Sequence, residues 1–257
     1  RSAARDVEST LKQIRQLKNA GCDIVRVAVP AKAALPAFRR IVARSPLPVI
    51  ADIHFDASLA LGAMENGAHG IRINPGNIGG NEKLKAVVRM AAQSKIPIRI
   101  GVNAGSLEKK YQRTGLARPE AMVASLLDKI KFIEDQHFFE LKVSLKSHDV
   151  RETVAANRLA DRSCPYPLHL GVTEAGTFFS GSIRSALGIG SLLLDGIGNT
   201  IRVSLTADPV REIGVARQIL AAAGLSRSGI ELISCPTCAR TSVDLIPLVA
   251  EFEKKIA

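Results

Sequence analysis

Short segments in which apolar and polar side chains alternate recur along this chain and predict β-strands. Residues 71–74 read Ile-Arg-Ile-Asn, and residues 25–27, 98–103, 143–146 and 201–204 repeat the pattern, with Lys in place of Arg in 143–146. Successive side chains of a strand point to opposite faces, so the branched aliphatic residues share one face and the cations share the other. Five predicted strands therefore carry a cation opposite an apolar face.

Between the predicted strands, apolar residues recur at spacings of three and four, which predicts helices. The first helix is predicted over 6–19, where four apolar residues fall on one face and Gly21 follows the end. The remaining helices are predicted over 33–43, 58–66, 81–94, 119–135, 149–161, 182–194, 210–223 and 243–256, and the strands over 22–30, 48–55, 70–74, 97–103, 140–146, 168–173, 200–205 and 230–234.

This alternation of strand and helix predicts a parallel sheet with helices outside it. Seven strands precede a C-terminal Cys pair and the chain opens on a helix, so we expect an α/β fold, a TIM-type (β/α)8 barrel lacking its first strand. A doubly wound open sheet is the alternative. It would bury both strand faces under helices and leave the cations without partners, whereas a barrel turns one face toward its lumen and mouth.

Composition narrows the class of protein. The 257 residues are 46% hydrophobic, which suits one α/β barrel. No apolar run approaches the ~20 residues of a membrane span, and neither a secretory signal nor a disulfide framework is evident, so a cytoplasmic protein is expected. The net charge of +11 suggests nucleic acid, but Trp is absent, Tyr is scarce and no basic block occurs. An acidic small molecule is the favoured ligand.

The five strand cations are Arg26, Arg72, Arg99, Lys146 and Arg202. Two cations ~8 Å apart at an effective dielectric of ~20 repel each other by about 2 kcal/mol. A group of five therefore needs an anion, and few carboxylates lie at the strand ends. For any single cation, a salt bridge in the lumen is the alternative. Because Arg favours bidentate oxyanions, the set predicts a polyanion site of the phosphate type.

Other polar residues share these faces or lie just beyond them. Asn74, Asn103 and Ser204 are neutral donors. Glu174 follows the strand predicted over 168–173, where it either transfers a proton or pairs with a cation. His54 follows Asp52 by two residues, and either a structural role or a functional role at the same mouth is possible for it. His148 and His169 are interpreted as structural or surface residues.

The segment Cys235-Pro-Thr-Cys238 follows an apolar stretch. The i, i+3 spacing lets two thiolates converge on one metal or cluster, and zinc, a redox disulfide or an iron–sulfur cluster would all fit. Cys22 and Cys164 are predicted at the opposite end of the barrel. Two ligands do not complete a cluster, so the others are expected from outside this sequence.

The ordered series VRVAVP, ADIHF, IRINPGN, IRIGVN, VSLK, LGVTEAG, IRVSLTADP and ISCPTC resembles the 4-hydroxy-3-methylbut-2-en-1-yl diphosphate synthase family of the non-mevalonate isoprenoid pathway. The resemblance covers essentially the whole chain. It implies an N-terminal barrel, here 1–228, and the start of a [4Fe-4S] domain, here 229–257. The family reduces 2-C-methyl-D-erythritol 2,4-cyclodiphosphate by two electrons from flavodoxin or ferredoxin, opens the ring, loses water and forms 4-hydroxy-3-methylbut-2-enyl diphosphate. Its members are homodimers.

The resemblance also implies roles for residues of this sequence. Glu174 would face the reacting carbon as a proton donor, and Cys235 and Cys238 would be two of the three cysteine ligands of the cluster. The diphosphate would be held by Arg26, Arg72, Asn74, Arg99, Asn103, Lys146, Arg202 and Ser204.

The sequence departs from the family in four ways. A strand ending in Ser-Met-Thr-Asn is missing before the first helix, and the third cluster cysteine and the glutamate ligand are absent, so this chain alone is expected to be inactive. Ala239 replaces the usual Gly, which would strain the cluster loop if that position needs a positive φ. Asn199 replaces the usual Asp. Two rivals remain: a cluster-free barrel enzyme acting on another phosphorylated or pterin diphosphate substrate, such as a dihydropteroate synthase relative, and a non-catalytic polyanion-binding module with a surface stripe of cations.

Overall fold

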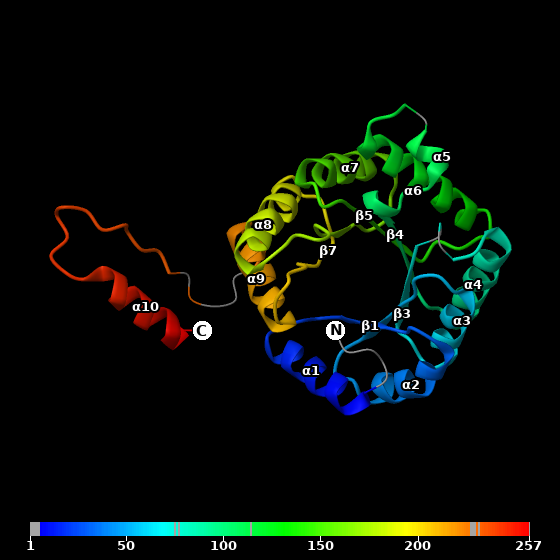
Figure 1. Ribbon diagram of the computed structural model, residues 1–257, viewed down its shortest axis with the longest axis horizontal. Coiled ribbons are helices and arrows are strands. Elements are labelled where there is room, and N and C mark those ends of the chain that lie inside the picture. Colours follow the sequence, from blue (N-terminus) through cyan, green and yellow to red (C-terminus); the bar gives the residue numbers. More distant parts are fainter. Residues whose placement is uncertain are drawn as a thin grey trace.

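A ring of parallel strands surrounded by helices makes up most of the computed structural model (Figure 1), which describes residues 6–74, 76, 78–113, 115–226, 230 and 232–256. The first sheet contains, in chain order, β1 (Val25–Ala28), β2 (Val49–Asp52), β3 (Gly70–Ile73), β4 (Ile98–Asn103) and β5 (Leu141–Lys146). The second pairs β6 (His169–Leu170) with β7 (Thr200–Ile201), and a parallel bridge from Val143 to Leu168 joins β5 to β6.

This strand order confirms the predicted barrel. Each strand of the first sheet pairs with the next strand along the chain. A doubly wound sheet would instead reverse its strand order at a switch point. The register sets Arg72 opposite Arg99 and Asn103 opposite Lys146, so the polar faces of neighbouring strands lie side by side.

Helices form the outer ring: α1 (Val7–Asn19), α2 (Leu35–Arg44), α3 (Ala57–Glu65), α4 (Asn81–Ser94), α6 (Arg118–Glu134), α7 (Val150–Ser163), α8 (Phe178–Leu194) and α9 (Pro209–Ala222). Short helical turns η1 (Lys32–Ala34), η2 (Ala104–Ser106) and α5 (Lys109–Gln112) lie in connecting segments, and α10 (Leu245–Ile256) ends the chain. Aspartates begin several helices by accepting a backbone N–H, as Asp6 does from Ser9 at 3.1 Å and Asp149 from Arg151 at 2.7 Å.

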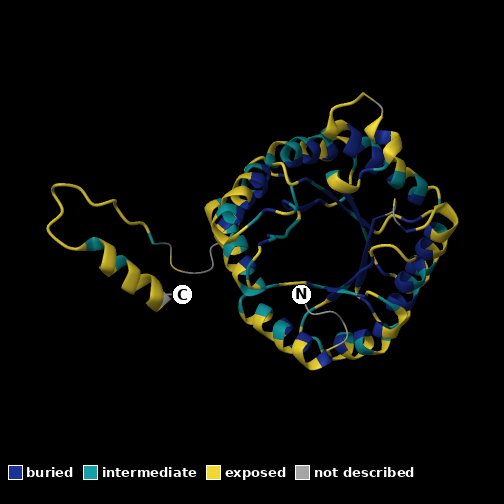
Figure 2. Ribbon diagram, in the orientation of Figure 1, coloured by how far each residue is buried: buried dark blue, intermediate teal, exposed yellow. Residues whose placement is uncertain are grey.

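The hydrophobic core lies between the outward faces of the strands and the helices (Figure 2). Ile71 and Ile73 of β3 are 1% and 0% exposed, and Phe38 of α2 is fully buried. Complete burial of such a side chain stabilises the fold by about 1.5–3 kcal/mol. The core holds the strands so that their cationic faces turn to the lumen.

The ring has a seam between β7 and β1. In the described part of the chain these two strands do not pair with each other. Instead α1 packs against α9, and Arg217 donates from Nε to the carbonyl of Ala20 at 3.1 Å and from Nη2 to that of Gly21 at 2.9 Å. Helix contacts therefore close the ring on its outside, and a cavity of about 660 Å³ lies behind the seam.

Several predicted elements need correction. The strand expected over 230–234 is wrong, since residues 230 and 232–234 form no strand and have no neighbouring strand with which to pair. The strands expected over 168–173 and 200–205 shrink to two residues each, because the seam removes one partner of β7. Helix α8 begins at Phe178, four residues earlier than expected. Ala239 is not among the described residues with positive φ, so the predicted strain there is not observed.

The described part of the tail, residues 230 and 232–256, buries none of its side chains that can be assessed. Along the described ranges, no helix is both long and apolar enough to cross a membrane.

Candidate functional site

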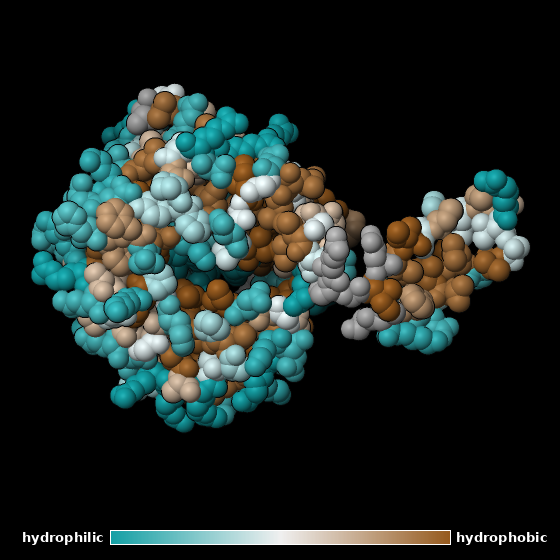
Figure 3. Space-filling model, turned by 180° about the vertical axis from the view of Figure 1, so that it is seen from behind, coloured by the Kyte–Doolittle hydropathy of each residue, from teal (hydrophilic) through white to brown (hydrophobic). Residues whose placement is uncertain are grey.

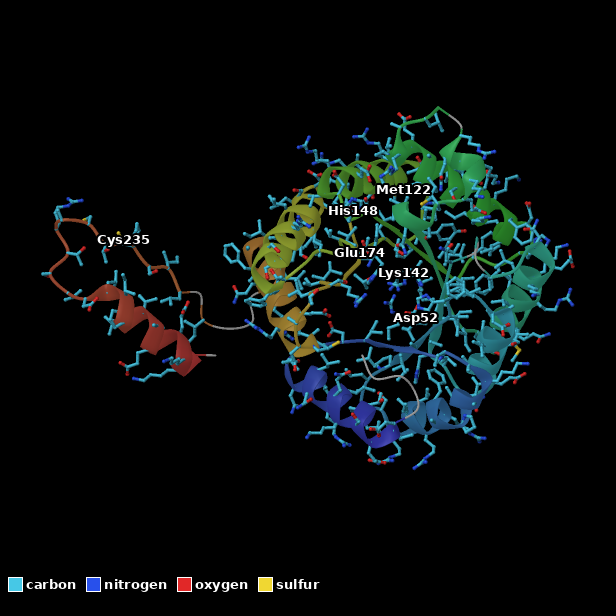
Figure 4. All side chains as sticks on the ribbon, viewed as in Figure 1. Asp52, Met122, Lys142, His148, Glu174 and Cys235 are labelled. Carbon is cyan, nitrogen blue, oxygen red and sulfur yellow. The ribbon has the colours of Figure 1, made fainter. Side chains whose placement is uncertain are left out.

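Basic side chains from neighbouring strands meet in the lumen. Arg72 of β3 lies opposite Arg99 of β4, and Arg99 lies opposite Lys142 of β5. Like charges directly opposite each other on one face destabilise a sheet, so this row needs compensation from elsewhere. In Figure 4, Asp52 and Lys142 are labelled inside the ring of helices.

Asp52 of β2 supplies the main compensation. Its carboxylate oxygens lie 3.2 Å from Nε of Arg26, 3.3 Å from Nη1 of Arg72 and 3.4 Å from Nε2 of His54. The residue is only 6% exposed. One buried carboxylate thus holds two guanidinium groups from the strands on either side of it.

The predicted cations are brought within electrostatic reach of one another. Burial, together with Arg202 and Arg72, lowers the pKa of Arg26 to about 10 despite the opposing effect of Asp52. Burial, with Arg26 and Arg72 next in importance, lowers the pKa of Arg99 to about 9. Burial and the four arginines also hold the pKa of Lys146 well below its usual value. The site therefore disfavours its own positive charge, which a bound anion would relieve.

The rival prediction of a non-catalytic module placed the cations in a stripe on the surface. The structure does not have this stripe, because these residues face the lumen.

The neutral donors lie at the strand ends. Asn74 is buried, donates from Nδ2 to Oγ of Ser106 at 3.2 Å and accepts the N–H of Gly76 at 3.2 Å, so it also shapes the loop after β3. Asn103 ends β4 opposite Lys146, and Ser204 is half-buried two residues after Arg202.

Glu174 lies just beyond β6 with φ at 53°, in the left-handed region. Figure 4 labels it inside the ring. It is exposed, and no described residue forms a hydrogen bond or ion pair with its side chain. The predicted alternative of a pairing with a lumen cation is therefore not observed. A non-glycine residue held in this region costs about 1–2 kcal/mol, a strain that often marks functional sites.

Cys235 and Cys238 are both exposed free thiols in the tail, and Figure 4 labels Cys235 away from the barrel. Hydrogen bonds from the backbone and side chain of Arg240 and from Thr241 lower the pKa of Cys238, which favours the thiolate that metals bind. Across the described ranges, no group of three or more His, Cys, Asp or Glu side chains could hold a metal ion. The two thiols could therefore supply only part of the ligands of a metal ion or cluster.

Sequence reasoning missed two residues that the lumen contains. Lys142 shares the inward face of Lys146, four residues away on the same strand, and this parity was a signal that could have found it. His169 of β6 is 8% exposed, and burial, with the nearby cations next in importance, holds its pKa well below the usual value. The sequence analysis interpreted His169 as a structural or surface residue and did not predict that it lies in the lumen beside these cations.

Comparisons with known proteins agree with this architecture. The model of the GcpE TIM-barrel domain matches residues 1–217. The chain is 55% identical over 250 residues to a protein of Lawsonia intracellularis named 4-hydroxy-3-methylbut-2-en-1-yl diphosphate synthase (flavodoxin), covering 97% of this chain and 70% of that protein. A protein of Clostridium perfringens with the same name is 53% identical over 254 residues, covering 98% and 73%.

Among solved structures, the Yersinia pestis dihydropteroate synthase superposes with a TM-score of 0.60 at 12% identity, over 85% of this chain and 89% of that one. A type I 3-dehydroquinate dehydratase from Clostridium difficile gives a TM-score of 0.58 at 12% identity, over 84% and 87%. At such identities these likenesses show a shared fold and nothing about the reaction.

Proposed function

The chain belongs to the 4-hydroxy-3-methylbut-2-en-1-yl diphosphate synthase family, and from this premise we propose that its lumen binds 2-C-methyl-D-erythritol 2,4-cyclodiphosphate. The proposed reaction is the reductive opening of the ring with loss of water, which gives 4-hydroxy-3-methylbut-2-enyl diphosphate for isoprenoid biosynthesis. The observation that carries the proposal is the group of buried and half-buried lumen cations around a single carboxylate, Asp52.

The charge balance favours a diphosphate. The five predicted cations and Asp52 together carry a formal net charge of +4, and three of the cations have no carboxylate partner among the described residues. Two linked phosphoryl groups supply two negative charges and several acceptor oxygens, and each charge-assisted hydrogen bond contributes about 1.5–3 kcal/mol. The residues proposed to hold the diphosphate are Arg26, Arg72, Asn74, Arg99, Asn103, Lys146, Arg202 and Ser204.

Glu174 is the proposed proton donor. Its position beyond β6, its freedom from ion pairs among the described residues and its strained backbone all support this role. The lumen cations would hold the substrate while negative charge accumulates on it during reduction.

Residues 229–257 are proposed as the start of a cluster domain that follows a barrel domain over 1–228. Cys235 and Cys238 would be two thiolate ligands of a [4Fe-4S] cluster, and when bound the cluster supplies single electrons to the substrate. Exposure of both thiols and the lowered pKa of Cys238 fit this role. The relatives' names specify flavodoxin, so we propose a flavodoxin as electron donor, ferredoxin as its alternative, and a homodimer as the working form.

Calorimetric titration of this chain with the cyclic diphosphate at moderate salt tests the proposal, with a nucleoside diphosphate as the control ligand. We expect saturable binding of the cyclic compound and much weaker binding of the nucleotide. A folded sample that binds neither ligand, or both equally, would overturn the proposed substrate. Steep loss of all binding with salt would instead indicate a general polyanion site.

A further inference from the structure

The side chain of Glu174 projects over an open lumen. The residue is exposed, and none of the described residues forms a hydrogen bond or ion pair with its carboxylate. Figure 4 labels it inside the ring, which is hollowed at its centre when seen from behind (Figure 3). The direction of this side chain therefore depends on the backbone that carries it, and a proton donor needs a fixed direction toward the atom that it serves.

The backbone at this position is strained. Thr173 and Glu174 form the centre of a turn after β6, and the φ of Glu174 is 53°. A positive φ at the second central residue of a turn favours glycine or asparagine, because a Cβ there crowds the following carbonyl. Such strain persists only where the surrounding structure over-determines it, so the turn needs restraints on both of its sides.

Before the turn, the restraint comes from the end of β5. The N–H of Thr173 donates to the carbonyl of Ser147 at 3.2 Å. Ser147 is itself fixed by Thr153 of α7, whose Oγ1 accepts the N–H of Ser147 at 3.0 Å and donates to its carbonyl at 3.1 Å. Ser147 and Thr153 are both fully buried, so the core of the fold holds this side of the turn.

After the turn, the restraint comes from α8 and from the segment that follows β7. Nη1 of Arg184 reaches back nine residues and donates to the carbonyl of Ala175 at 3.3 Å. Side chains of a helix point toward its N-terminus, which is the direction of this turn. The N–H of Thr206 donates to the carbonyl of Gly176 at 2.9 Å. The bond from Arg184 acts on the residue next to Glu174 and comes from a side chain, so a substitution can remove it alone.

We propose that Arg184 is a positioning residue that holds Glu174 at its positive φ and so keeps the carboxylate over the lumen. Removing the bond frees the carbonyl of Ala175 and lets the turn relax to a negative φ, which redirects the side chain of Glu174. Arg184 acts through the backbone of the turn and not on the substrate. Its importance for the reaction rests on the proposed function of Glu174 as proton donor. Because Arg184 is exposed, its replacement opens no cavity in the core.

The backbone of Glu174 tests this role without substrate. In NMR spectra the intraresidue NOE between the amide and α protons is strong where φ is positive, because the two protons are then closest. We expect a strong NOE for Glu174 in the wild type, a weak one in Arg184→Met, and a strong one in Arg162→Met, which removes an exposed arginine of α7. Circular dichroism establishes that each variant is folded. A weak NOE in the wild type, or a strong NOE that survives in Arg184→Met, would overturn the inference.

A second experiment measures the consequence for the reaction in a protein that carries the complete cluster domain. Arg184→Met should lower kcat by about tenfold or more, since a misdirected acid transfers its proton poorly, and should change KM for the cyclic diphosphate little. In a Glu174→Ala background the same substitution should cause no further loss of kcat, because the group that it positions is already gone.

The outcomes separate this inference from the proposed function. A full additional loss of kcat in the Glu174→Ala background would overturn the positioning role of Arg184. A weakened NOE in Arg184→Met, together with full turnover in Glu174→Ala, would support the restraint on the turn and overturn the proposed proton donor.

Discussion

Asp52 and Arg72 are cross-strand neighbours on β2 and β3, and Nη1 of Arg72 lies 3.3 Å from Oδ1 of Asp52. Both side chains are less than a tenth exposed. The other carboxylate oxygen of Asp52 lies 3.2 Å from Arg26. This ion triad fixes the direction of two guanidinium groups before any ligand arrives, which reduces the entropy lost on binding.

Removing the carboxylate tests the triad. In Asp52→Asn, the buried guanidinium group of Arg72 and the half-buried one of Arg26 lose their compensating charge, so we expect the free energy of unfolding to fall by about 3–5 kcal/mol. Urea denaturation measures this change, and added phosphate should recover part of it. Glu82→Gln, which removes an exposed partner of Lys85, is the control and should cost less than about 1 kcal/mol. A loss in Asp52→Asn no larger than in this control would contradict the triad's role.

Arg72→Ala tests the proposed substrate contact. Loss of a charge-assisted hydrogen bond should weaken binding of the cyclic diphosphate by about 2 kcal/mol or more. Calorimetry on the folded variant measures it, with Arg39→Ala on the exposed face of α2 as the matched control. Unchanged affinity in Arg72→Ala would remove Arg72 from the proposed site.

The inward face of the barrel shows how far sequence reasoning reaches. The placement of Arg72 and Arg99 opposite an apolar face follows from a period of two, which is local information. The ion pairs of Asp52 depend on the register between β2 and β3, which local alternation does not determine. Lys142 was missed because the alternating pattern was taken over 143–146 alone, although the strand was predicted over 140–146 and the parity of Lys142 matches that of Lys146.

Elements that need a partner were the least predictable. Residues 230–234 form a short apolar run typical of a strand, yet no described strand pairs with those of them that the structure describes. The seam between β7 and β1 similarly shortens β7. The strain at Glu174 also lay beyond local patterns, since a glutamate gives no sign that its φ will be positive.

Titration of Lys146 should make both the free energy of unfolding and the affinity for the ligand depend on pH. Burial and the surrounding arginines hold its pKa well below the usual 10.5. As pH rises through that lowered value, the native state loses a proton that the unfolded chain keeps until about pH 10.5. The unfolded state then binds more protons, so the free energy of unfolding rises with pH in this window.

Affinity for the diphosphate should change in the opposite direction, because the neutral amine no longer attracts an anion. Calorimetry across this window in wild type and Lys146→Met measures the effect. The variant is expected to bind more weakly at low pH and to show a flatter pH dependence. Parallel curves for the two proteins would exclude Lys146 as the titrating group.

The two cysteine environments predict an order of reactivity. Hydrogen bonds to Cys238 lower its pKa, whereas burial raises the pKa of both Cys22 and Cys164. Since the thiolate is the nucleophile, iodoacetamide near neutral pH should label exposed Cys238 well before either of the other two. Mass spectrometry of timed samples measures the order. Arg240→Ala should slow labelling of Cys238, while Arg151→Ala, a change on α7, should leave it unaltered.

The strained backbone at Glu174 predicts that replacing this residue by glycine raises the free energy of unfolding while turnover is lost. Glycine adopts a φ of 53° without the steric cost that a Cβ imposes. Glu174→Gly should therefore raise the free energy of unfolding by about 1 kcal/mol, measured by urea denaturation. Glu174→Ala keeps the Cβ and should bring no such gain, so the pair of variants separates backbone strain from loss of the carboxylate.

Both variants remove the proposed proton donor. A protein that carries the complete cluster domain should therefore lose turnover in both variants, while its affinity for the cyclic diphosphate changes little. Equal stability of the Gly and Ala variants would show that the fold tolerates this φ without cost, and the strain would no longer support a catalytic role for Glu174.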